Sequence, residues 1–245
     1  MFSIFRKKAA TTTDLGWLHT DLHSHLVPGI DDGSPDMATS LELIKGLKEL
    51  GFGNLITTPH VLWELYPNTS EIITRGSAEV QQMLQQETFK IPFKAAAEYF
   101  IDEHLDSELK AKKPLLTIKD NLVLVEFSML TAPFDLQELL FEMQVQGYQP
   151  LIAHPERYIY LRHNKAFYDE MKNWGCLFQV NLLSLVGHYG GVVQDLATYL
   201  VQKEYYDYAG TDLHSARHLT GLQKLGASPL YNQLRQSGLL KNHLL

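Results

Sequence analysis

Apolar strands that alternate with amphipathic helices constrain most strongly what this chain can fold into. The segment "LVLVEF", within residues 121–128, is apolar on both faces, as a parallel strand covered by helices must be. The segment "MATSLELIKGLKELG", which begins at Met37, instead repeats its apolar residues every three or four positions and predicts a helix. We predict seven strands, each followed by helical sequence, at residues 17–25, 53–60, 91–100, 121–128, 149–157, 176–185 and 206–215. This alternation predicts a parallel α/β architecture, either a barrel or a doubly wound sheet.

Charge and cysteine content narrow the functional classes. The formal net charge of −7 argues against a general surface for nucleic acid or anionic membranes, which requires a basic balance. It leaves room for an acidic enzyme whose bound metal ions supply a local positive field. Cys176 is the only cysteine, so no intrachain disulfide can form and a reducing, cytoplasmic compartment is expected. No apolar run is long enough to span a bilayer, so we predict no transmembrane segment.

The amino-terminal stretch "MFSIFRKKAATTTD" has the wrong order for a secretory signal, because the basic residues follow the apolar ones and no apolar stretch comes next. We predict a flexible amino-terminal segment at residues 1–16 and one domain at residues 17–245. Contact of residues 2–8 with a membrane or a partner is the alternative.

Potential metal ligands stand at the carboxyl end of every predicted strand except the sixth. They are His23, His25, His60, Glu98, Glu126, His154, Asp212 and His214. In α/β barrels the active site lies at this face and is assembled from several strand ends. Asp32 follows in "DDG", where Asp31, Asp32 and Gly33 also suit an ordinary turn.

Each of these residues alone has an ordinary structural explanation. His23 and His25 share one face of a strand, but an H-x-H pair by itself is a weak signal. His60 and His154 each neighbour a proline and would suit a turn. Glu126 is harder to dismiss, because a carboxylate that ends an apolar strand is rarely buried without a partner or a metal. Their convergence on one barrel rim predicts a metal centre.

The type of ligand indicates the chemistry. Histidine and carboxylate without thiolate favour Mn²⁺, Fe²⁺ or Zn²⁺ over a structural zinc, and nine candidates are enough for two or three ions. Clustered divalent ions stabilise the attacking and leaving oxygens of phosphoester hydrolysis. Arg157 and Arg217, each three residues after a candidate histidine, could bind a phosphate or form surface salt bridges.

Seven short motifs together carry a family resemblance. They are, in order, "DLHSH", "DDG", "TPH", "AEYF", "VEFS", "AHPERY" and "GTDLH". This set resembles the polymerase and histidinol phosphatase (PHP) superfamily, and within it the CpsB/CapC-like protein-tyrosine phosphatases of bacterial capsule and exopolysaccharide systems. The match extends from about residue 17 to residue 218, and "DLHSH…DDG" with "AHPER" is specific to this branch.

The resemblance implies a distorted, TIM-like (β/α)7 PHP barrel that holds three metal ions, usually manganese. It implies that His23 and His25 bind one ion with Glu98 and Asp212. A second ion would be held by Asp32, His60 and His214. Glu126 and His154 would serve the third, with bridging by Glu98. Arg157 would bind the substrate phosphate. Arg217 would be a second arginine for the phosphate, although its spacing after the Asp-x-His motif is shorter here than in the family. The implied substrate is the phosphotyrosine-bearing C-terminal tail of a partner tyrosine kinase that controls polysaccharide export.

The sequence also bears on mechanism. Cysteine-dependent tyrosine phosphatases require C-x₅-R, but Leu182 stands six residues after Cys176, so a metal-bound hydroxide that attacks phosphorus is the expected nucleophile. Cys176 is expected to pack at the start of a strand. Two alternatives stay open: a small-molecule phosphatase with a substrate such as histidinol phosphate, and a non-catalytic binding module. Trp63 and Tyr66 either line a phosphotyrosine pocket or pack their loop, and the oligomeric state is left open.

Overall fold

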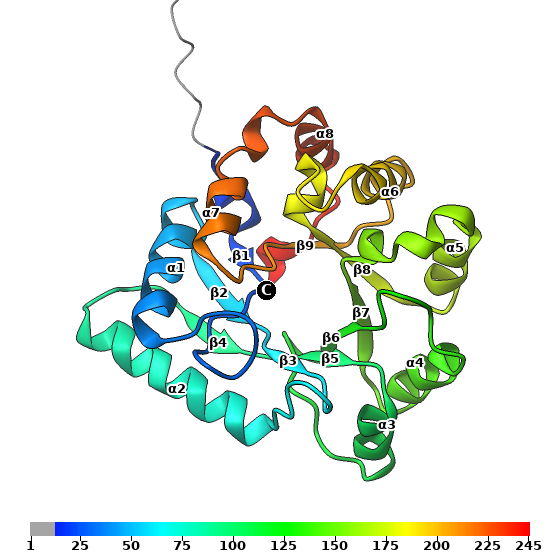
Figure 1. The fold of residues 1–245 in the computed structure, drawn as a ribbon, viewed down its shortest axis with the longest axis horizontal. Helices are drawn as coiled ribbons and strands as arrows, with labels where there is room; N and C mark the ends of the chain where they lie inside the picture. The colour runs from blue at the N-terminus through cyan, green and yellow to red at the C-terminus, as the bar shows by residue number, and fades with distance from the viewer. Residues whose placement is uncertain (1–12) are drawn as a thin grey trace, which may run out of the picture.

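A parallel sheet that curls on itself, with helices on its outer side, forms this single-domain α/β protein (Figure 1). The computed structural model describes residues 13–245. Its strands are β1 Thr20–Asp21, β2 Asn54–Thr57, β3 His60–Val61, β4 Phe93–Ala95, β5 Glu98–Phe100, β6 Leu122–Glu126, β7 Gln149–Ala153, β8 Leu177–Asn181 and β9 Tyr208–Gly210. Its helices are α1 Met37–Glu49, α2 Ser70–Gln86, α3 Glu103–Lys110, α4 Leu136–Val145, α5 Ala166–Asn173, α6 Gly191–Gln202, α7 Ala216–Leu222 and α8 Pro229–Ser237.

Strand order follows chain order, and every pairing is parallel, which confirms the predicted parallel α/β class. Three strands pair as β1-β2-β4 and six as β3-β5-β6-β7-β8-β9. An isolated parallel bridge between Ser24 and Leu213 joins the first and last segments of the curl. A doubly wound sheet reverses its strand order at a switch point, so the curled arrangement favours the barrel alternative.

Two predicted strands are interrupted. Residues 53–60 form β2 and β3, with a break around Pro59, which has no N–H to donate to a ladder. Residues 91–100 likewise form β4 and β5. The pairs Thr57–Ala95 and His60–Glu98 have the same register on both sides of the break. The predicted strands 17–25, 149–157 and 176–185 were too long, because 3-10 helices occupy Gly16–Leu18, Pro155–Arg157 and Leu182–Val186. Of the predicted strand 206–215, only Tyr208–Gly210 form a strand.

Alternation along the strands divides the core in two. On β6, Leu122 and Leu124 pack inside the curl, whereas Val123 and Val125 pack outward against the helices. Glu126 continues the inward column and is the last residue of the strand. The inside of the curled sheet is therefore apolar along most of the strands and carries carboxylate and imidazole groups toward their carboxyl ends.

The opposite, amino end of the sheet is closed by residues 242–245. The Asn242 amide donates to the carbonyl oxygens of Thr20 (2.9 Å) and Ala209 (2.7 Å), and its Oδ1 accepts from Ala209 N–H (2.9 Å). This side chain thus links β1 to β9, which belong to two different sets of paired strands. Leu245 packs against the inner core, and Figure 1 shows the C-terminus inside the ring of strands.

Replacing Asn242 with alanine is expected to lower the free energy of unfolding by about 2–4 kcal/mol, because two carbonyls and one N–H lose their partners in a buried place. Urea unfolding measures the change. Asn173→Ala, at an exposed helix end, is the control and should change it by about 0.5 kcal/mol or less. Equal unfolding midpoints for the two variants would contradict the bridging role.

The amino-terminal prediction is only partly within the described chain. Residues 1–12 of the predicted flexible segment lie outside it. Leu15 is fully buried, and its N–H donates to the Leu50 carbonyl. None of the helices in residues 13–245 is long and apolar enough to cross a membrane.

Candidate metal centre

The structure brings together all nine side chains that the sequence predicts as ligands. Their nitrogen and oxygen atoms form overlapping groups within 4.8 Å at the carboxyl ends of the strands: His25–Asp32–His60–His214, His23–His154–Asp212, His23–His25–Glu98 and His60–Glu98–Glu126. Five imidazoles and four carboxylates thus share one small volume. His60 and Glu98 begin β3 and β5, Glu126 ends β6, and the others except Asp32 follow β1, β7 or β9 within a few residues.

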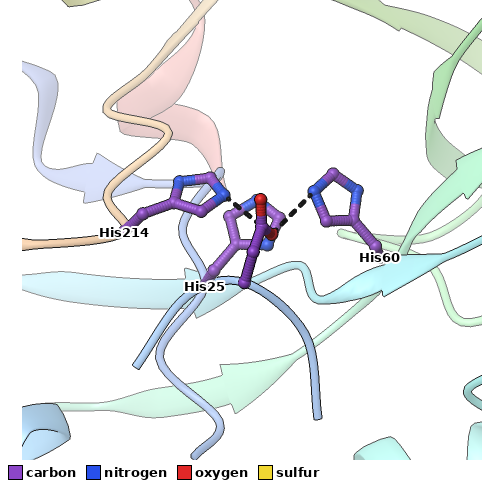
Figure 2. A group of neighbouring side chains, drawn as sticks. His25, His60 and His214 are labelled. Atoms are coloured by element: carbon purple, nitrogen blue, oxygen red, sulfur yellow. Dashed lines mark ion pairs between the residues drawn. The ribbon is translucent and has the colours of Figure 1, made fainter. Parts of the chain in front are cut away.

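One side of the cluster is formed around Asp32. Its Oδ1 lies 3.4 Å from Nε2 of His60 and 3.4 Å from Nε2 of His214. Figure 2 shows the rings of His25, His60 and His214 converging from three segments, with these two ion pairs dashed. Gly33 allows the Asp32 loop to approach, because a Cβ there would lie 2.3 Å from the His25 carbonyl oxygen.

Glu98 lies at the centre of the other groups. Its Oε2 is 3.2 Å from His23 Nε2, 3.5 Å from His25 Nε2 and 3.1 Å from His60 Nδ1, and its Oε1 is 3.2 Å from His154 Nε2. Glu126 Oε1 lies 3.0 Å from the same His60 nitrogen. One carboxylate therefore contacts four imidazoles.

Hydrogen bonding does not account for this arrangement. Within residues 13–245, both Glu98 oxygens and Nδ1 of His60 are buried and have no partner in hydrogen-bonding geometry. Each carboxylate oxygen nevertheless lies within 3.2 Å of an imidazole nitrogen. Buried polar atoms without partners are costly and rare. Nitrogen and oxygen atoms that face a common centre without hydrogen bonds between them fit divalent cations, and these donors suit Mn²⁺, Fe²⁺ or Zn²⁺.

The electrostatics agree with a site built for positive charge. Burial alone would raise the pKa of Glu98, but His23 and His60 hold it well below its usual value. Burial alone would lower the pKa of His23, but Glu98 and Asp212 outweigh burial and raise it to about 9. Without cations, protons on His23 and His60, whose pKa values are both raised, offset the charge of the carboxylates.

Three side chains that the sequence does not single out as ligands hold the cluster in place. Gln179 Oε1 lies 2.8 Å from His23 Nδ1, and the Asn181 amide donates to Asp212 Oδ2 at 2.8 Å. Both lie on β8, the strand without a ligand, and follow Leu177 on its inward face. Asp31 Oδ2 lies 2.8 Å from His25 Nδ1, so Asp31 orients a histidine while Asp32 faces the cluster. Such partners fix the orientation of metal-binding side chains.

Backbone strain coincides with two of the nine residues. His154 (φ 32°), directly after β7, and Asp212 (φ 50°), two residues after β9, both adopt left-handed conformations. Residues other than glycine rarely do so, and such strain persists where the surrounding structure fixes it, typically at functional sites.

A cavity of about 550 Å³ opens above the cluster. Its lining includes Asp32, His60, Glu126, His154, Arg157, Tyr189, Asp212, His214 and His218. Arg157 donates to Asp212 Oδ2 at 2.8 Å and lies over the Tyr189 ring at 4.7 Å. Burial would lower its pKa, but Asp212 raises it, so the guanidinium is charged at the cavity wall.

The remaining predicted residues lie as follows. Arg217 is exposed at the start of α7 and does not line this cavity, although Ala216 and His218 do. Tyr66 stacks on His60 with ring centroids 5.5 Å apart, whereas Trp63 stacks on His104 outside the cavity. Cys176 is buried just before β8, and burial raises the pKa of its thiol to about 12, which agrees with a packing role.

A curled, half-barrel parallel sheet covered by helices, with nine potential metal ligands gathered near the carboxyl ends of its strands, defines an α/β protein with a candidate metal centre. Residues 19–225 match the family described as capsular polysaccharide synthesis, CpsB/CapC. The chain belongs to this family, and the predicted family resemblance is confirmed.

Individual relatives agree. The chain is 28% identical over 198 residues to the tyrosine-protein phosphatase YwqE of Bacillus subtilis (strain 168), which covers 80% of this chain and 78% of the relative. It is 26% identical over 202 residues to the tyrosine-protein phosphatase CpsB of Streptococcus pneumoniae, covering 80% and 82%. A solved structure from work on YwqE and CpsB, described there as unique metal-dependent tyrosine phosphatases, superimposes with a TM-score of 0.77 at 26% identity and covers 91% of this chain and 94% of its own.

Proposed function

We propose that this protein is a metal-dependent protein-tyrosine phosphatase of capsule or exopolysaccharide synthesis. The observation that carries the proposal is Glu98, a buried carboxylate in contact with four imidazoles and without hydrogen bonds, beside a cavity with a charged arginine. The named activities of its relatives YwqE and CpsB support the same substrate class.

We propose three ions, with Mn²⁺ the expected species. His23, His25, Glu98 and Asp212 would hold one, Asp32, His60 and His214 a second, and Glu126 and His154 the third, with Glu98 as the bridge. Bound divalent ions supply a water of lowered pKa and positive charge for phosphoryl oxygens. Arg157 has N–H groups beyond the one bonded to Asp212, and these would orient the phosphate. Arg217 would act from the rim of the cavity.

The proposed strand count rests on one further observation. The common register across the interrupted strands supports counting β2 with β3 and β4 with β5, which gives a seven-stranded PHP barrel over residues 17–245. The phosphotyrosine would belong to the C-terminal tail of a partner tyrosine kinase, in the cytoplasm.

Phosphate release from a phosphotyrosine peptide with Mn²⁺, measured beside release from histidinol phosphate, tests the function. We expect clear preference for the peptide and loss of turnover in His60→Ala. Preference for histidinol phosphate would establish the small-molecule alternative, and metal binding without any turnover would favour the binding module.

Metal binding at about pH 7.5 is expected to release about one proton or more per chain, because imidazoles must be neutral to coordinate. The metal-free protein keeps the proton on His23 up to a pKa of about 9, and the pKa of His60 and His214 is also raised. Affinity should therefore rise with pH and level off only above about 9. Titration calorimetry in buffers of different ionisation heats counts the protons; binding heats that do not depend on the buffer would refute the expectation.

Replacing Asn181 with alanine is expected to weaken metal binding about 10- to 100-fold, the usual effect of removing a side chain that holds a ligand. The loss leaves Arg157 as the remaining donor to Asp212 Oδ2 among the described residues. Calorimetry measures the affinity, with Asn173→Ala as the matched control. An affinity equal to that of the control would show that Asp212 is positioned without Asn181.

A further inference from the structure

A second groove lies next to the cavity above the metal cluster, on the same face of the molecule. It has a volume of about 500 Å³ and is lined by Leu62, Trp63, Glu64, Phe100, Ile101, Asp102, Glu103, His104, Pro133 and Asp135. These residues come from the end of β5 and from the segments that follow β3, β5 and β6, the strands that carry His60, Glu98 and Glu126. None of them lines the cavity above the metal cluster.

The metal cluster and the second groove are only two residues apart along the chain. Phe100 follows Glu98 by two residues on β5, and Leu62 follows His60 by two residues. Two residues of a strand span roughly 7 Å, which is also the span of two residues in an extended peptide. A peptide with its phosphotyrosine in the cavity therefore reaches the groove with residues a few positions away.

The groove is apolar at its base and is flanked by exposed apolar side chains. Leu62, Phe100, Ile101 and Pro133 form apolar lining. Trp63 is 47% exposed. Leu65, between β3 and α2 like Trp63, and Leu130 and Phe134, between β6 and α4 like Pro133, are more exposed still. Neighbouring exposed apolar side chains of this size are typical of binding surfaces.

Trp63 is held in place rather than left loose. Leu62 and Tyr66 exchange backbone hydrogen bonds at 3.3 and 2.7 Å, so residues 62–66 form a closed turn. The indole stacks on His104 with ring centroids 4.0 Å apart and an angle of 12° between the planes. A fixed aromatic platform binds a side chain at a low cost in conformational entropy.

The charges of the groove are of one sign. Four of its lining residues are carboxylates, and no described lining residue is lysine or arginine. Asp102 caps α3, but Glu64, Glu103 and Asp135 form no ion pair in the part of the chain that the structure describes. Arg157 and the proposed ions meet the phosphate in the cavity, so the acidic groove complements a positive charge elsewhere on the same peptide.

We propose that this groove binds the polypeptide that flanks the substrate phosphotyrosine and selects a lysine or arginine a few residues from it. The aliphatic stem of the basic side chain lies on Trp63 and the apolar base, and its charged end reaches Glu64 and Glu103. This inference rests on the proposed phosphatase function and adds the substrate's flanking chemistry to it.

The test compares kcat/KM for three substrates with the Mn²⁺-loaded protein. They are a phosphotyrosine peptide with lysines two to four residues away on both sides, the same peptide with glutamates there, and p-nitrophenyl phosphate, which has no flanking residues. The native protein should prefer the lysine peptide by about tenfold or more, a usual size for complementary charges at a binding rim. The double variant Glu64→Lys/Glu103→Lys should remove or reverse this preference, and Trp63→Ala should reduce it, while both leave p-nitrophenyl phosphate turnover within about twofold.

A matched charge reversal far from the groove, Glu42→Lys/Glu79→Lys on exposed faces of α1 and α2, controls for net charge and should keep the preference. Equal turnover of the two peptides by the native protein overturns the groove inference alone. An equal loss of preference in the control does the same. Absence of turnover for all three substrates removes the phosphatase function, and this inference with it.

Discussion

Replacing Glu98 with glutamine is expected to lower phosphatase turnover by more than about 100-fold, beyond the 10- to 100-fold usual for side chains that only hold a ligand. Glutamine keeps the volume of the fully buried side chain but removes its charge. Four imidazoles then lose the carboxylate that faces them, and the amide N–H₂ points at ring nitrogens. We therefore expect most of the bound metal to be lost.

Metal content after dialysis and phosphate release from a phosphotyrosine peptide together measure this effect. Glu79→Gln, on the exposed face of α2, is the control for loss of one carboxylate. A separate readout uses the metal-free protein: because Glu98 is the larger of the charges that raise the pKa of His23 to about 9, this pKa should fall in the variant, as followed by NMR. Full metal content and turnover in Glu98→Gln would rule out a bridging role.

Much of the arrangement of the cluster follows from the sequence because parallel strands present their carboxyl ends at one edge. His60 and Glu98 are 38 residues apart in the chain but face each other in register on β3 and β5. The order and direction of the strands are therefore enough to predict that these side chains lie close together. That these side chains bind metal stays a prediction.

The side chains that orient the cluster were not predictable in the same way. Gln179 and Asn181 are neutral amides, which are common on any strand and carry no distinctive spacing. The available signal was the inward column from Leu177 to Asn181, which changes from apolar to polar as it approaches the rim. Asp31 orients His25, whereas Asp32 faces the cluster. This difference depends on the turn geometry of their loop, which the amino-acid composition does not specify.

The predicted boundaries of the strand at residues 53–60 were wrong for a local reason. The proline in "TTPH" interrupts a ladder in which the register is otherwise continuous, so one predicted strand appears as β2 and β3. The pattern of apolar residues extends over the whole segment 53–60, whereas the ladder of hydrogen bonds is interrupted at Pro59, which has no N–H. The same segment still delivers His60 to the cluster, because the break does not change the register.

Replacing Arg157 with lysine is expected to lower kcat/KM for a phosphotyrosine peptide by about 100- to 1000-fold, the range seen when a preorganised donor to a developing negative charge is removed. Lysine keeps the charge but not the planar fork that binds a phosphate through two parallel hydrogen bonds. It also cannot stay bonded to Asp212 while presenting further donors in fixed directions. Both kcat and KM should therefore worsen.

Because Arg157 also touches Asp212, metal content decides how the loss is interpreted. Retained metal with low kcat/KM places the effect on the phosphate, whereas loss of metal means that Arg157 acts mainly by holding Asp212. Arg217→Lys is the matched comparison, since this exposed side chain does not line the cavity, and its loss should be about tenfold or less. Equal losses for the two variants would mean that Arg217 swings over the rim and shares the phosphate, as the family resemblance implies for a second arginine.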